Sequence, residues 1–176
     1  MNLKKIVIKA YFFDMMYILK TTGGMTMAIG AHMTSVLNGT ISAVKSVLPL
    51  TVEVDQPKYI NQHFEQEAIS VLIGMTGDLP GRLIIDGTEA CMSKIGEVMF
   101  GMPLQGEMLE SFSAELGNMI AGNLATTLAQ SNTIIDITPP TVLIGSARMS
   151  GFDRALSLPI QIENIGTLHA ILIVEM

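Results

Sequence analysis

The sequence predicts a mixed α+β domain whose largely antiparallel sheet packs against two long helices. Apolar residues recur at helical spacing from about 31 to 48 and again from about 106 to 131. Two turn signals, TGDLPG at 76–81 and ENIG at 163–166, each separate two β-rich runs and predict hairpins. Each half of the chain thus offers a long helix followed by a hairpin, which indicates a pseudo-duplicated fold.

In the first half, Pro49 ends the first helix because proline cannot continue the hydrogen-bonding pattern. Residues 51–54 alternate like a short strand. Residues 56–66 are polar and irregular, and we expect a loop there. The runs at 68–75 and 82–85 then form the first predicted hairpin.

In the second half, Thr88 is a suitable N-cap for a helix that runs to Phe100 and ends at Gly101. The long second helix begins near Gly106, and its acidic first turn suits the positive end of the helix dipole. Three β-rich runs follow it: 141–144, 156–163 and 168–175.

Composition excludes several classes of protein. The 176 residues carry a net charge of −6, which argues against nucleic-acid binding, since that needs a basic surface. The single cysteine, Cys91, permits no disulfide within the chain, and we expect a cytoplasmic protein. Cys91 lies in an apolar stretch and is interpreted as a buried structural thiol.

The first 26 residues are best treated as an N-terminal extension. They resemble a signal peptide at Lys4 and Lys5, but Lys9 and Asp14 interrupt the apolar run, which is also too short to span a bilayer. Because a ribosome-binding sequence can encode the pair Gly23-Gly24, an alternative interpretation is that residues 1–26 are a mis-annotated start and that translation begins at Met27. We therefore expect no membrane association and a single domain over 27–176.

Several kinds of active site have no counterpart in the sequence. There is no P-loop, no Rossmann glycine pattern and no nucleophile elbow. His32, His63 and His169 are far apart and offer no zinc-binding pattern. We expect no cofactor or metal of the chain's own, so any catalytic machinery must be simple.

A polar stripe on the second long helix contains the candidate site. At about 100° per residue, Ser111, Glu115, Asn118 and Gly122 fall on one narrow line. A separate and mainly apolar face is formed by Leu109, Leu116, Ile120, Leu124 and Thr127. The stripe should therefore face solvent, and from spacing alone it fits an ordinary solvated helix face.

The pattern Ser111-x3-Glu115-x2-Asn118, followed by Pro139-Pro140, resembles the signature of the chemotaxis phosphatases CheC, CheX and FliY. Thr141 stands where that signature places its proline, directly after Pro140. The likeness extends more weakly over residues 27–176 through the order of elements.

The first helix carries a second version of the motif, Ala31-x3-Ser35-x2-Asn38, in which serine replaces the glutamate. The resemblance therefore implies one active site per chain, as in CheX rather than CheC. It also implies a homodimer, for which the C-terminal strands are plausible pairing edges.

The resemblance implies a protein phosphatase that hydrolyses the aspartyl phosphate of a CheY-type response regulator, in chemotaxis or two-component signalling. Asn118 would orient the attacking water and Glu115 would pair with a lysine of the regulator. Ser111 would lie at the edge of the contact, and Gly122 would let the partner's backbone approach. The Mg²⁺ would belong to the regulator.

Two other interpretations remain open. The chain could be a non-catalytic module that binds a response regulator, or a flagellar-switch-like interaction protein, in which case binding would occur without turnover. It could also be a small-molecule enzyme or sensor with an apolar pocket, although the sequence contains no polar cluster for that chemistry.

Overall fold

The computed structural model describes residues 25–174, which form three helices and eight strands. The helices are α2 (Met25–Val47), α3 (Glu89–Phe100) and α4 (Gly106–Ala129). The strands are β1 (Val52–Val54), β2 (Lys58–Glu65), β3 (Ile69–Gly77), β4 (Gly81–Gly87), β5 (Ile135–Ile137), β6 (Thr141–Ile144), β7 (Arg148–Ile162) and β8 (Gly166–Val174). The chain divides into two compact units, Met1–Asn38 and Gly39–Met176, and the boundary falls inside α2.

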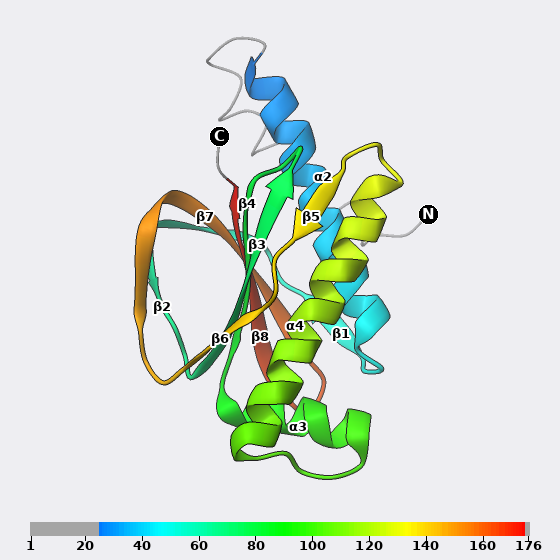
Figure 1. Ribbon diagram of the computed structural model, residues 1–176, viewed down its shortest axis with the longest axis vertical. Coiled ribbons are helices and arrows are strands. Elements are labelled where there is room, and N and C mark those ends of the chain that lie inside the picture. Colours follow the sequence, from blue (N-terminus) through cyan, green and yellow to red (C-terminus); the bar gives the residue numbers. More distant parts are fainter. Residues whose placement is uncertain (1–24, 175–176) are drawn as a thin grey trace. The chain divides into compact units, whose positions relative to one another are not determined.

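The second unit contains one antiparallel sheet in the order β1-β7-β8-β4-β3-β5. Strand β2 pairs with the first part of β7, and β6 pairs with the first part of β3 (Figure 1). Every pairing in the described residues is antiparallel. The predicted fold class is therefore confirmed, including both hairpins.

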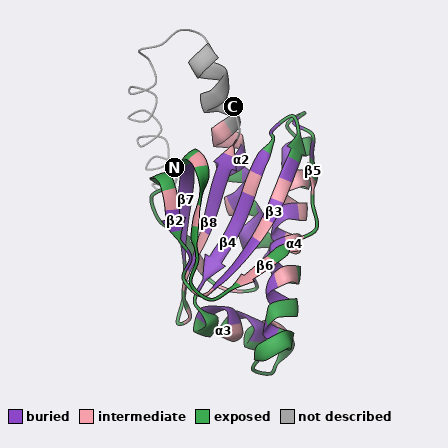
Figure 2. Cartoon of the chain, turned by 60° about the vertical axis from the view of Figure 1, so that its left-hand side comes forward, coloured by how far each residue is buried: buried purple, intermediate pink, exposed green. Residues whose placement is uncertain are grey.

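Helix α4 covers one face of the sheet, which positions the site. Val71 and Ile73 of β3 point toward α4, where they lie next to Gly117. Because side chains alternate along a strand, Leu72 lies on the opposite face. Figure 2 shows that the central strands are largely buried, whereas the outer side of α4 is half-buried or exposed.

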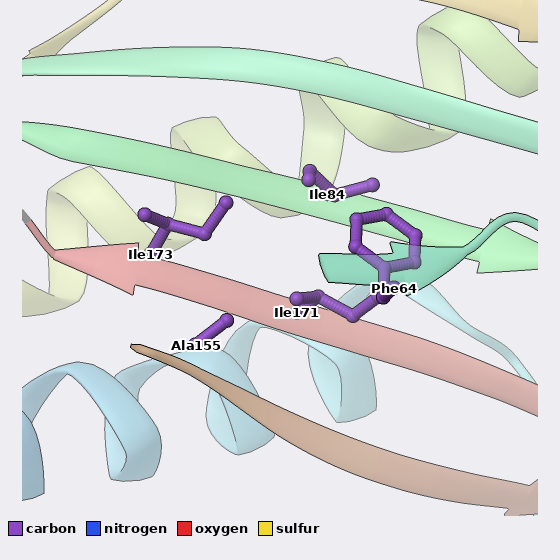
Figure 3. Packing of buried hydrophobic residues seen from close by; sticks show 5 residues of the cluster. All are labelled: Phe64, Ile84, Ala155, Ile171 and Ile173. Carbon is purple, nitrogen blue, oxygen red and sulfur yellow. The ribbon is translucent and has the colours of Figure 1, made fainter. Parts of the chain in front are cut away.

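The face of the sheet away from α4 is covered by β2 and the first half of β7. Phe64 of β2 and Ala155 of β7 form a buried cluster with residues of β4 and β8 (Figure 3). Those residues are Ile84, Ile171 and Ile173. Both faces of the sheet are thus shielded, which explains why β4 is buried at every position except Arg82 and why no residue of β8 after Gly166 is exposed.

The prediction of a loop at residues 56–66 is wrong, because residues 58–65 form β2. Most side chains of β2 are exposed, so its sequence is polar and resembles that of a loop. Its pairing register with β7 also shifts between Asn61 and His63. Strand β7 likewise begins at Arg148, eight residues before the predicted start. The expectation that the C-terminal strands are free pairing edges is also wrong, because β8 lies between β7 and β4.

A buried polar group lies on the same side of the sheet as Leu72. Asp86 is 3% exposed and accepts hydrogen bonds from the Ser70 hydroxyl at 2.5 Å and the Glu67 amide at 3.2 Å. Burial raises the pKa of Asp86 despite these hydrogen bonds. Its partners lie on or beside β3, away from α4, so this carboxyl belongs to the sheet rather than to the predicted site.

The N-terminal extension predicted over residues 1–26 lies mostly outside the described residues, which begin at Met25. The proposed start at Met27 falls within α2, which begins at Met25. No helix in residues 25–174 is long and apolar enough to cross a membrane.

Candidate active site

Helix α4 is fixed to the sheet by a continuous buried face. Four leucine and isoleucine side chains of this face are at most 2% exposed: Leu109, Leu116, Ile120 and Leu124. Gly117 lies so close to β3 that an added Cβ would be 2.6 Å from a Val71 methyl carbon. The absence of a side chain at Gly117 therefore allows α4 to approach the sheet closely.

The predicted stripe lies on the outward side of the same helix. Ser111 and Glu115 are exposed, while Asn118 and Gly122 are half-buried. An added Cβ at Gly122 would meet no atom within 4 Å, so this glycine faces open space. At about 1.5 Å of rise per residue, the stripe is roughly 16 Å long.

The polar side chains of α4 divide into two groups by their hydrogen bonds. Four donate to the helix backbone four residues earlier, among them the Asn123 amide to Met119 O at 2.9 Å. The Glu115 carboxylate and the Asn118 carboxamide have no hydrogen-bond or ion-pair partner within the described part of the chain. The stripe therefore keeps its donors and acceptors available for another molecule.

A groove of about 450 Å³ opens beside the N-terminal half of the stripe, where α3 meets α4. Its apolar lining comes from Phe100, Leu104, Met108 and Phe112, and its polar lining from Glu107, Ser111 and Glu115. Ser111 and Glu115 therefore belong to both the stripe and the groove.

The apolar part of this groove was not predicted from the sequence. Gly101 ends α3 with φ 76°. The Ser93 hydroxyl then donates a hydrogen bond to Leu104 O at 2.8 Å. The Phe100 and Phe112 rings meet edge to face, with their centroids 5.8 Å apart. Two features of the sequence could have indicated it. Phe100 directly precedes Gly101, which ends α3, and Met108 lies in the acidic first turn of α4.

The loop that follows α4 was expected to contribute a proline. Pro139 and Pro140 link β5 to β6, and Thr141 is the first residue of β6. Thr138, just before them, is anchored to β3, because its amide donates to Gly74 O and its hydroxyl accepts from Gly74 N, both at 2.9 Å. The two prolines therefore directly follow a residue, Thr138, that is hydrogen-bonded to β3.

Cys91 is a buried thiol, as expected. It is 2% exposed, and burial raises its pKa to about 11, with the nearby Glu67 charge adding to the effect. The thiol is protonated at neutral pH, so it is a poor nucleophile.

The second version of the motif lies on α2 in the other unit. Ser35 is half-buried and Asn38 is exposed, and the side chain of Ala31 lies outside the described residues. The glutamate position is occupied by serine, so this helix lacks the carboxylate that accompanies the asparagine on α4. One site per chain remains a prediction.

The stripe can bind and position but has limited chemistry of its own. A carboxamide donates and accepts hydrogen bonds without being basic, and a carboxylate attracts a cation. Within the described residues, no group of three histidine, cysteine or acidic side chains is placed to hold a metal ion. Such a site suits a reaction in which the partner supplies most of the reactivity.

Residues 69–159, just over half of the chain, match the family model described as chemotaxis phosphatase CheX. The CheY-P phosphatase CheX of Thermotoga maritima is 31% identical over 137 residues, which cover 75% of this chain and 88% of the relative. The chain belongs to the CheX family of chemotaxis phosphatases. It is therefore an enzyme of the phosphatase class, a hydrolase, as the motif predicted.

Solved structures of the CheX family share the fold. CheX from Desulfovibrio desulfuricans superposes with a TM-score of 0.69 at 19% identity, covering 81% of this chain and 97% of that one. CheX from Borrelia burgdorferi, solved in a complex with CheY, BeF3 and Mg²⁺, gives a TM-score of 0.67 at 22% identity, covering 82% and 97%.

Proposed function

We propose that the chain hydrolyses the aspartyl phosphate of a CheY-type response regulator, with Asn118 orienting the attacking water. The observation that carries this proposal is the Asn118 side chain. It lies on the outward stripe of a rigidly packed helix, and its carboxamide has no partner within the described residues. Because the chain belongs to the CheX phosphatase family, we assign this carboxamide to the hydrolysis step.

Two relatives support the choice of substrate. The Thermotoga maritima relative is a CheY-P phosphatase, and the Borrelia burgdorferi CheX structure holds CheY together with BeF3 and Mg²⁺. We infer a regulator of the same class as the partner here. Mg²⁺ would arrive with the regulator, so the phosphatase needs no cofactor of its own.

The reaction needs only positioning, because an acyl phosphate is already reactive. The Asn118 carboxamide accepts a hydrogen bond from a water molecule and directs its oxygen in line with phosphorus. The new bond joins the water oxygen to phosphorus, and the bond between phosphorus and the aspartyl oxygen breaks. The aspartate leaves as a carboxylate, and the proton of the water passes to solvent or phosphate.

The other stripe residues hold the regulator. Glu115 pairs with the lysine beside the regulator's phosphoryl group, which fixes the docking geometry. Ser111 lies at the edge of this contact with a smaller role. Gly122 faces open space, so it allows the regulator's backbone to come close to α4.

We also infer that the enzyme acts as a homodimer in the cytoplasm, where response regulators receive phosphate. Each protomer would carry one α4 stripe. Sedimentation of the purified chain measures the dimer directly, and a monomer at micromolar concentration would contradict it.

The function is tested by the decay of a labelled aspartyl phosphate on a CheY-type regulator, with Mg²⁺ present and the regulator in excess. We expect many turnovers per molecule of phosphatase. Asn118→Ala should reduce the decay to that of the regulator alone. Asn123→Ala is the matched control, because its amide is engaged with Met119 O, and it should retain activity.

A decay that the wild-type chain does not accelerate would contradict the proposed function. If the chain nevertheless binds the phosphorylated regulator, the result would favour a non-catalytic docking module, since an exposed stripe can bind without catalysing.

A further inference from the structure

We propose that the groove between α3 and α4 is a second part of the regulator-docking surface, which binds an apolar side chain that lies next to a lysine or arginine on the regulator. This inference rests on the proposed function and deepens it, because it names what the partner must carry besides its phosphoryl group.

The groove is built before any partner arrives. Leu104 and Phe112 are 4% and 6% exposed and form its floor. Gly96 leaves room for Leu104, since an added Cβ there would be 2.4 Å from a Leu104 methyl carbon. The Ser93 hydroxyl holds the Leu104 carbonyl in place. A preorganised floor lowers the entropy lost when a partner binds.

The rim of the groove exposes large apolar side chains. Phe100 is 63% exposed and Met108 is 54% exposed. These two exposed apolar side chains line the same groove, whereas single exposed apolar residues are usually scattered over a surface. Grouped apolar exposure of this kind is typical of surfaces that bind a partner. Methionine is suited to this use because its flexible side chain adapts to different shapes.

The charge of the groove restricts the partner further. Glu107 and Glu115 line it, and no lysine or arginine is present in its lining. Glu115 faces the regulator's phosphoryl-site lysine in the proposed complex, but an apolar side chain alone would leave the Glu107 carboxylate without a counter-ion as water is displaced. The occupant should therefore combine an apolar side chain with a cation.

The groove is continuous with the proposed catalytic stripe, which identifies the regulator as its occupant. Ser111 and Glu115 belong to both. Asn118 lies ten positions after Met108, or about 15 Å along the helix. A protein partner covers about 800 Å² on each side, a patch roughly 30 Å across. A regulator that places its phosphoryl group at Asn118 is therefore large enough to cover the groove.

The groove would then select among regulators. The phosphoryl pocket has common chemistry in this class of protein, so Asn118 and Glu115 cannot distinguish one regulator from another. An apolar and cationic contact about 15 Å away from Asn118 supplies that distinction.

The test measures affinity for the regulator loaded with beryllofluoride, a stable phosphoryl mimic, so that turnover does not interfere. Met108→Ser and Glu107→Lys should each raise Kd about tenfold, as expected if both belong to the minority of interface residues that contribute most of the binding energy. Both variants keep Asn118. In dephosphorylation assays they should therefore raise the half-saturating regulator concentration.

The control variants change similar side chains elsewhere. Tyr59→Ser removes a large apolar side chain that is 50% exposed on β2, and Glu163→Lys reverses an exposed charge in the β7–β8 turn. Neither residue lines the groove, and neither variant should change Kd by more than about twofold.

A Kd within twofold of wild type for either groove variant would overturn the inference, while dephosphorylation by the wild-type chain would still support the proposed function. Loss of self-association in Met108→Ser without regulator present would also overturn it, because a second copy of the chain would then occupy the groove. Failure of the wild-type chain to bind or dephosphorylate the regulator would remove both proposals.

Discussion

Asn118 and Asn123 lie five residues apart on α4 and use their side chains differently. Asn123 donates to the helix backbone at Met119 O, whereas Asn118 faces outward with its carboxamide available. Helical geometry alone places Asn118 in line with Glu115 and Ser111. The residues of the stripe were therefore predictable from the sequence, since spacing fixes which side chains share a helix face.

Glu115 should act through its charge. Glu115→Gln keeps the size of the side chain but removes the carboxylate that pairs with the regulator's lysine. We expect binding to weaken about tenfold, or about 1.4 kcal/mol, at low salt. Titration of the regulator at low and high salt measures this effect. A salt dependence equal to that of wild type would contradict the charged contact.

Cys91 should be unreactive while the protein is folded. Its pKa rises from an ordinary 9.0 to about 11, so the thiolate fraction at neutral pH falls about a hundredfold. Alkylation should be slow at pH 7 and should accelerate when urea unfolds the chain. Labelling at the same rate in the folded and unfolded protein would contradict the burial of this thiol.

The same shift has a consequence for stability. Because the pKa of Cys91 is raised in the folded state, its contribution is complete below about pH 9 and is lost as pH rises through about 11. Cys91→Ala removes this dependence, so the stability difference between the two proteins should change only in that alkaline window. Urea unfolding at pH 8 and pH 10.5 compares them.

At the level of elements, α4 combines one face that packs with one that binds, and two glycines separate these roles. Gly117 lies against Val71 of β3, whereas Gly122 faces open space. Gly117→Ala should destabilise the fold by roughly 1–3 kcal/mol because the added methyl group overpacks the interface. Gly122→Ala should stabilise the free chain by about 1 kcal/mol through helix propensity.

Urea unfolding measures both glycine variants. Gly122→Ala should also weaken regulator binding if the partner's backbone approaches α4 at this point. Equal stability changes for the two substitutions would show that α4 does not pack on β3 as described.

Across the whole molecule, elements with local signals were predictable and those made by distant pairing were not. The ends of α3 follow from Thr88 and Gly101, and the β3–β4 hairpin from its turn. Strand β2 pairs Glu65 with Arg148, 83 positions apart in the chain, and its polar sequence gives no sign of that partner. The groove was missed for the same reason, since it exists only where α3 and α4 meet.

In the proposed mechanism, Asn118 acts on the attacking water rather than on docking. The most direct measurement compares wild type and Asn118→Ala in two assays, binding to the beryllofluoride-loaded regulator and turnover of the phosphorylated one. We expect Asn118→Ala to bind within about threefold of wild type while its turnover falls at least a hundredfold, as for a lost positioning group. Equal losses of binding and turnover, or retained turnover, would contradict the assignment.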